Sequence, residues 1–209
     1  MNKPTKNEYP IAHALQQRWS PRAFDAQRPI ERDKLLSLLE AARWSPSSYN
    51  SQPWRFIVAE RRNEIAFHTM ISVLSNSNQR WAKDAGALIL IAARTVHDDG
   101  RINRYGGHDA GVALANLTVQ AVEMGLFVHP MAGFDPLKAR ETYAIPEAYE
   151  PITISAVGYY GALEQLADDL RERELKPRER LPLTDLVYEG RFGQIAALVR
   201  PSAPTEAPA

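Results

Sequence analysis

The stretch from Ser45 to Trp54 reads SPSSYNSQPW and lies between a helical pattern and an apolar strand pattern. Its ten residues include four serines, one Asn and one Gln, bounded by Pro46 and Pro53. Hydroxyl and amide groups on a loop between two rigid elements suit a planar, polar ligand with several hydrogen-bond acceptors. An ordinary polar connection has a similar composition, so other segments of the chain must decide between the two interpretations.

A second informative segment is Arg18–Trp19–Ser20–Pro21–Arg22. Pro21 pushes Ser20 into an extended conformation, in which alternate side chains share a face. Arg18, Ser20 and Arg22 are therefore expected to point to one side. Two guanidinium groups beside a hydroxyl suit a phosphate. Two surface arginines after a short helix are an equally weighted interpretation of the same spacing.

Length and composition indicate a single globular domain over residues 1–200, followed by a Pro/Ala-rich tail, residues 201–209, that we expect to be disordered. The 25 basic and 25 acidic residues balance, which gives no support for a nucleic-acid or membrane partner. Cysteine is absent, and no signal peptide or membrane-length apolar run is found. We therefore expect a cytoplasmic protein.

Several common chemistries have no motif in this chain. The two glycine-rich motifs that bind nucleotide phosphates, G-x-x-x-x-G-K-[ST] and G-x-G-x-x-G, are absent. No G-x-S-x-G nucleophile elbow is found either. The five histidines show no metal-ligand spacing, so no metal site is expected. They are His13, His68, His97, His108 and His129.

Helical and strand patterns alternate along the chain. Helices are expected over residues 29–44, 63–74, 109–124 and 163–174, and strands over residues 54–59, 87–93, 126–130 and 152–160. Ser75–Gln79 reads as a polar break, and Asp135 followed by Pro136 reads as a helix start. This interleaving predicts one α/β or α+β domain. The helix over 109–124 is apolar nearly all round, so it is buried in the core or against a partner subunit.

Three segments taken together resemble the FMN-dependent nitroreductase family. They are residues 18–24, 45–54 and 125–135, in this order, with the near-apolar helix directly before the third. The resemblance runs from about Arg18 to Phe192. It implies an α+β, nitroreductase-like fold with a central mixed β-sheet wrapped by helices. It also implies an intertwined homodimer with two FMN sites at the subunit interface.

The resemblance assigns cofactor-binding residues in four groups. Arg18 and Ser20 would face the phosphate, Arg22 the ribityl chain and the N1/O2 edge, and Trp19 belongs to the same motif. The loop donated by the other subunit would supply Pro46, Ser47, Ser48 and Asn50.

The other two groups come from later in the chain. Asn78 would lie against the pyrimidine edge, and the backbone of the turn Met131–Ala132–Gly133 would approach flavin N5 and O4, where a glycine permits close contact. The basic C-terminal segment would close on the phosphate through Arg178 and Arg180. Trp81 replaces a flavin-contacting lysine of some relatives, and Tyr49 and His129 lie at variable positions.

The implied activity is reduction of nitroaromatics, quinones or similar small acceptors by NADH or NADPH, with hydride passing through flavin N5. The cofactor carries the chemistry, so no catalytic side chain is assigned. Alternatives are a flavin-dependent dehydrogenase or dehalogenase of the same superfamily, or a non-catalytic flavin-binding protein. A further alternative is a helical interaction protein that dimerises through residues 109–124.

Overall fold

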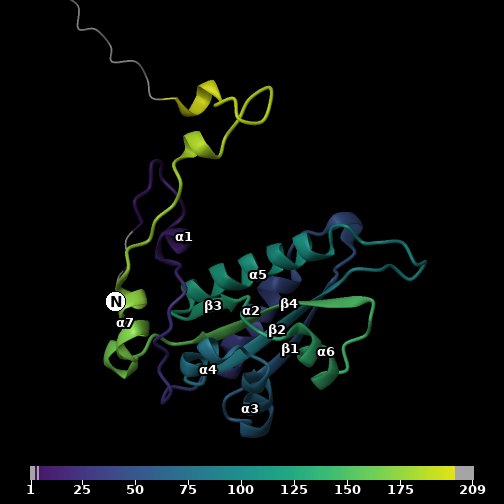
Figure 1. Ribbon diagram of the computed structural model, residues 1–209, viewed down its shortest axis with the longest axis vertical. Coiled ribbons are helices and arrows are strands. Elements are labelled where there is room, and N and C mark those ends of the chain that lie inside the picture. The colour runs from purple at the N-terminus through teal and green to yellow at the C-terminus, as the bar shows by residue number, and fades with distance from the viewer. Residues whose placement is uncertain (1–2, 4, 201–209) are drawn as a thin grey trace, which may run out of the picture.

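A four-stranded sheet forms the centre of the computed structural model, which describes residues 3 and 5–200. Its strands are β1 (Trp54–Glu60), β2 (Ala87–Arg94), β3 (Phe127–Met131) and β4 (Tyr149–Gly158). They lie in the order β1-β2-β4-β3 (Figure 1). Every neighbouring pair is antiparallel. The expectation of a mixed sheet is therefore wrong for the described part of a single chain, and the predicted tail at residues 201–209 lies outside the described residues.

Helices cover both faces of this sheet, as expected for an α+β fold (Figure 1). One face packs against α2 (Arg32–Arg43) and α5 (Gly106–Glu123), and the other against α3 (Glu64–Ser72), α4 (Asn76–Ala82), α6 (Pro136–Thr142) and α7 (Asp168–Leu175). Strand β2 is buried along nearly its whole length and divides its side chains between the two faces. Leu88 and Leu90 enter one hydrophobic cluster, while Ile89 and Ile91 enter the other. The alternation follows from the two-residue period of a strand.

Helix α5 confirms the near-apolar pattern but is only half covered. Its buried face carries Ala110, Ala113, Leu117 and Ala121. A second apolar stripe, formed by Val112, Ala115, Val119 and Val122, is exposed or half-buried. Gly125, with φ 72°, follows the helix and permits the left-handed turn into β3. One chain therefore leaves much of the apolar surface of α5 uncovered.

Two helix predictions need correction. Ser75–Gln79 is not a break, because α4 starts at Asn76 and runs through it. Asn76, Ser77 and Arg80 are exposed, while Trp81 and Ala82 are buried. The half-buried Asn78 and Gln79 side chains donate to the backbone carbonyls of Gly133 and Leu74. The helix expected from residue 163 begins only at Asp168, after a 3-10 turn over Leu163–Gln165. The predicted start of α6 is confirmed, because the Asp135 side chain accepts a hydrogen bond from the backbone of Lys138 at 3.0 Å.

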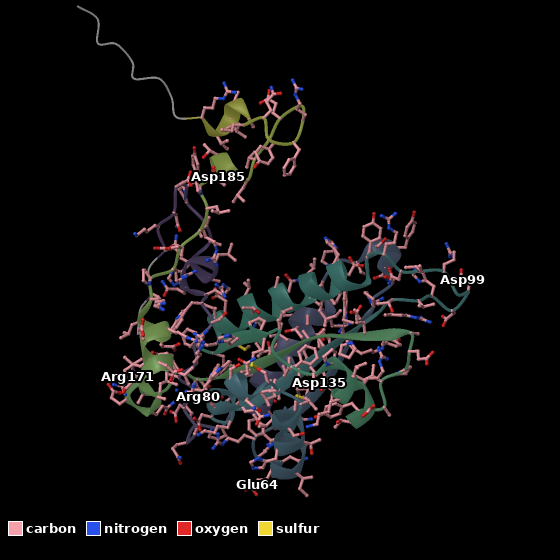
Figure 2. All side chains as sticks on the ribbon, in the orientation of Figure 1. Glu64, Arg80, Asp99, Asp135, Arg171 and Asp185 are labelled. Atoms are coloured by element: carbon pink, nitrogen blue, oxygen red, sulfur yellow. The ribbon has the colours of Figure 1, made fainter. Side chains whose placement is uncertain are left out.

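After α7 the chain leaves the body as a C-terminal arm, residues 176–200, that passes beside α1 (His13–Gln17) (Figure 1). Asp185 on this arm lies apart from the sheet, while Arg80 and Arg171 lie together near its base (Figure 2). Arg80 pairs with Asp169 at 2.6 Å and fixes α7 to α4. The arm exposes large apolar side chains, namely Leu181, Leu186, Phe192 and Leu198. No helix in the described part of the chain combines the length and apolar character that crossing a bilayer requires.

Candidate cofactor site

Three arginines from distant parts of the chain converge on one cavity. Arg18, Arg178 and Arg180 line a space of about 490 Å³, and the other lining residues are Thr5, Lys6, Asn7, Ile11, Leu15 and Glu179. Within the described residues, none of the three arginines pairs with a carboxylate. Burial, together with the positive charges of Arg178 and Arg180, lowers the pKa of Arg18. A bound anion would stabilise such a cluster, and guanidinium groups match phosphate oxygens in particular.

Arg18, Ser20 and Arg22 were expected to point to one side, and two of them, Arg18 and Ser20, do so. The Arg18 guanidinium donates to the Ser20 hydroxyl at 3.3 Å, so these two groups are neighbours. Arg22 instead turns toward Glu174, with 3.8 Å between its guanidinium and the carboxylate. That carboxylate is buried, and its attraction for a nearby cation outweighs the simple alternation of an extended segment.

The Trp19 side chain belongs to the core. It is 5% exposed, and its ring packs edge-on to Phe127, with centroids 5.9 Å apart, and beside Tyr160 at 5.4 Å. A contact between Trp19 and a ligand would therefore come from its backbone.

Asn78 and the turn at Gly133 lie together, as expected. The Asn78 side-chain amide donates to the Gly133 carbonyl at 2.9 Å, and the backbone N–H of Ser75 donates to the same oxygen at 2.9 Å. A Cβ at position 133 would lie 2.7 Å from Asn78 Nδ2 and 2.8 Å from Ser75 Oγ. Any other residue here requires that the turn or these two side chains move. Ala132 is exposed, whereas the Met131 side chain is buried in the core.

His129 connects this turn to the arginine segment. Its Nδ1 lies 2.8 Å from the Pro21 carbonyl, and a carbonyl only accepts, so Nδ1 carries the proton. The imidazole ring lies 4.4 Å from the ring of Trp81, which is buried. Burial, together with Arg22 and Arg18, lowers the His129 pKa to about 4. The two residues His129 and Pro21 are 108 positions apart, and no sequence signal links them.

The serine-rich loop is fastened to α5 at two points. The backbone N–H of Ser48 donates to Asp109 Oδ2 at 3.0 Å, and the Asn116 side chain donates to the Ser45 hydroxyl at 2.8 Å. Within the loop, Tyr49, Asn50 and Gln52 all have positive φ, at 51°, 55° and 45°. Residues other than glycine adopt positive φ at a cost in conformational energy. Surrounding contacts hold them there, often at ligand sites.

The loop and the arginine cluster lie at opposite ends of α5. The loop contacts Asp109 in the first turn, whereas residues of α1, just before Arg18, line a cavity with Val122 at the far end. The two attachment points are about 20 Å apart at the rise of an α-helix. One copy of the chain therefore does not bring the loop residues onto the arginine cluster. Those residues are Pro46, Ser47, Ser48 and Asn50.

No group of three or more His, Cys, Asp or Glu side chains with metal-binding geometry occurs among the described residues. The anchoring roles of Glu174, Asp109 and Asn116 were not foreseen from the sequence. Glu174 belongs to a strongly charged segment that resembles a solvent-exposed helix face, so composition offered no signal for it.

Comparisons with known proteins identify the family and the relatives of this chain. A model of the nitroreductase family matches residues 15–159. The oxygen-insensitive NAD(P)H nitroreductase of Salmonella typhimurium is 39% identical, over 86% of this chain and 99% of that protein. An uncharacterized 15.4 kDa protein of Mycolicibacterium smegmatis is 37% identical over 146 residues, which cover 66% of this chain and 97% of that protein.

Solved structures share the same fold. An oxidoreductase containing FMN superposes with a TM-score of 0.85 at 36% identity, covering 90% of this chain and 96% of the other. A nitroreductase family protein from Clostridium difficile 630 gives a TM-score of 0.67 at 25% identity, covering 88% and 100%. The match to the family model over most of the chain, together with these relatives, shows that the chain belongs to the nitroreductase family.

Proposed function

We propose that this protein is an FMN-dependent NAD(P)H oxidoreductase that reduces nitroaromatics, quinones or similar small acceptors. The observation that carries the proposal is the cavity in which Arg18, Arg178 and Arg180 gather, with the Ser20 hydroxyl 3.3 Å from the Arg18 guanidinium. Glu179 also lines this cavity, but among the described residues none of the three arginines forms an ion pair. Such a site suits the phosphate of a mononucleotide. The relative from Salmonella typhimurium, an NAD(P)H nitroreductase, supports the same assignment.

The residues at the other end of the proposed site also fit a flavin. Ala132 of this turn is exposed and Gly133 carries no side chain, so the backbone here can approach a flat ring. When bound, FMN supplies hydride transfer between the nicotinamide and the acceptor. The protein residues bind and orient the cofactor. Arg18, Ser20, Arg178 and Arg180 hold its phosphate, and Asn78, Ala132 and Gly133 face its ring.

We further propose that the site is completed across a homodimer. The loop carrying Ser48 lies at the end of α5 away from Arg18, so in a dimer the loop of a second copy would reach the cluster. Two surfaces are available for such an interface. One is the second apolar stripe of α5, and the other is the set of exposed apolar residues on the C-terminal arm. An arm that packs on the other copy would make this dimer intertwined.

One spectroscopic experiment tests the proposed activity. The purified protein is incubated with FMN, freed of excess flavin, and titrated anaerobically with NADH and then NADPH. We expect a bound flavin band that bleaches and that returns when a nitroaromatic or quinone is added. A protein that binds no flavin contradicts the proposal.

Two other outcomes point to the alternatives. A bound flavin that neither nicotinamide reduces favours a non-catalytic flavin-binding protein. A flavin that is reduced but not reoxidised by these acceptors favours a dehydrogenase or dehalogenase. We also propose a cytoplasmic location, because a chain without cysteine forms no disulfides and is therefore compatible with a reducing compartment.

A further inference from the structure

Glu174 is a fully buried carboxylate at the base of the C-terminal arm. It lies in the last turn of α7, where the helix dipole disfavours a negative charge. Burying a carboxylate is also costly unless hydrogen bonds and a cation compensate. The stability of α7 alone therefore does not account for a buried carboxylate at this position.

The partners of the Glu174 carboxylate lie about 150 residues earlier in the chain. Oε1 accepts hydrogen bonds from the backbone N–H groups of Arg22 at 2.9 Å and Ala23 at 3.2 Å, and Oε2 lies 3.0 Å from the same Arg22 nitrogen. The Arg22 guanidinium is 3.8 Å away. A carboxylate only accepts, so both oxygens serve to fix this piece of backbone.

A second link joins the same two segments on the other side of Arg18. The Arg178 guanidinium donates to the carbonyl oxygens of Gln16 at 2.6 Å and Lys3 at 3.1 Å. Arg18 and Ser20 thus lie between two sets of hydrogen bonds, one from Arg178 of the arm to Gln16 and one from Arg22 to Glu174 of α7. Both sets involve a stretch of five residues, 174–178.

We propose that Glu174 is a positioning residue for the arginine cluster formed by Arg18, Arg178 and Arg180. Its carboxylate fixes the Arg18–Arg22 segment to the base of the C-terminal arm, so that Arg18 and the arm's Arg178 and Arg180 face one phosphate. The inference rests on the proposed binding of FMN, and it predicts an effect that is specific for the phosphate end of the ligand. Glu174 itself does not touch the ligand.

The test compares FMN with riboflavin, which has the same ring but no phosphate. Both are titrated into the apoprotein by quenching of flavin fluorescence, for the wild type, E174Q and the control E172Q. Glu172 lies on the same helix but is exposed. The amide introduced by E174Q can present its oxygen in place of Oε1, but its NH₂ then opposes the Arg22 N–H and the Arg22 guanidinium, so the segment shifts. We expect FMN affinity to fall at least tenfold and riboflavin affinity less than threefold, with E172Q unchanged.

Equal losses for the two flavins, or no loss of FMN affinity, would overturn the inference, because a general structural role affects both ligands alike. If E174Q does not fold, E174D carries the test. It keeps the charge on a shorter side chain, and a folded E174D with an unchanged FMN to riboflavin ratio equally overturns the inference.

Failure of the proposed function is recognised separately. In that case the wild type itself binds neither flavin. Inorganic phosphate, measured by calorimetry, then replaces FMN as the probe of the arginine cluster. Weaker phosphate binding by E174Q than by E172Q supports the positioning role, and equal binding contradicts it.

Discussion

Asp109 Oδ2 accepts a hydrogen bond from the backbone N–H of Ser48 at 3.0 Å, which ties the start of α5 to the serine-rich loop. Asp109 is 3% exposed, and its other oxygen lies 2.9 Å from Nδ1 of His108. Beyond Ser48 the loop passes through two adjacent residues with positive φ, Tyr49 and Asn50. Contacts of this kind hold the loop in a conformation that it would not keep alone.

Asp109→Ala should release the loop. The N–H of Ser48 loses its acceptor, so we expect the free energy of unfolding to fall by about 1–3 kcal/mol, measured by urea denaturation. Flavin titration should show FMN affinity reduced about tenfold. Glu123→Ala, at the exposed end of the same helix, is the control. Destabilisation with unchanged FMN affinity would show that the loop does not contact the cofactor.

Gly133→Ala should disturb the turn proposed to face the flavin ring. The new Cβ would lie 2.7 Å from Asn78 Nδ2, so either the turn or the amide must move. We expect FMN and riboflavin affinity to fall together by tenfold or more. Gly107→Ala is the matched control, because a Cβ there meets nothing within 4 Å. Equal flavin affinities in the two variants would remove Gly133 from the site.

Arg180→Gln tests the arginine cluster, of which Arg180 is the most exposed residue. Its guanidinium donates only to the neighbouring Glu179 carbonyl among the hydrogen bonds of the described chain, so removing it should hardly affect stability. A charge-assisted contact to phosphate is worth about 1.5–3 kcal/mol, which is a loss of tenfold or more in FMN affinity. The effect should shrink as salt is raised. Arg191→Gln, an exposed residue of the same arm, should leave FMN binding unchanged.

His129 should make stability depend on pH. Its pKa is lowered from 6.5 to about 4 in the folded chain, chiefly by burial, so the unfolded chain takes up this proton first. Stability from the neutral imidazole is therefore complete above pH 6.5 and decreases as pH falls toward 4, by up to about 3 kcal/mol.

His129→Gln removes this titration, so its urea stability should change less between pH 7 and pH 4.5 than that of the wild type. The carboxylates titrate in both proteins, which makes the difference between the two curves the informative quantity. His68→Gln, on the exposed side of α3, should behave as the wild type. Parallel curves for His129→Gln and the wild type would contradict the buried neutral state.

Val119→Glu should separate the proposed dimer. The substitution places a charge in the second apolar stripe of α5, where burial against a second copy is costly. Light scattering should show a monomer, and FMN affinity should fall because the loop of the second copy is lost. Ile65→Glu is the control, since Ile65 is an 83% exposed apolar residue on α3. A monomeric wild type that binds FMN would contradict the shared site.

Much of the local structure of this chain could be predicted from periodicity. The strands β1 and β2 start at the expected residues, Trp54 and Ala87, because their apolar runs are bounded by turn residues. The start of α6 followed from Asp135 and Pro136, since a side-chain cap and a proline act locally. The start of α4 was missed because its first residues are polar, and its burial depends on Trp81 reaching Phe24 across the core.

The chemistry of the site was visible in the sequence only as residue types. Arginines beside a hydroxyl, a glycine after a strand and a serine-rich loop indicate a phosphate and a planar ring wherever they meet. Their meeting is a property of the tertiary structure. Arg178 reaches Gln16 across 162 positions, and Glu174 draws Arg22 away from the face that an extended segment would give it.

The sequence by itself determined most of the helices and all four strands, because those patterns depend on neighbours within a few residues, whereas α4 was missed. It also supplied the arginines at positions 18, 178 and 180 and the serine-rich loop with little apolar content. Only the tertiary structure decided which side chains share a cavity, which cation pairs with the buried carboxylate, and that loop and arginines lie at opposite ends of α5. These relationships depend on packing between residues far apart in the chain, for which no local pattern exists.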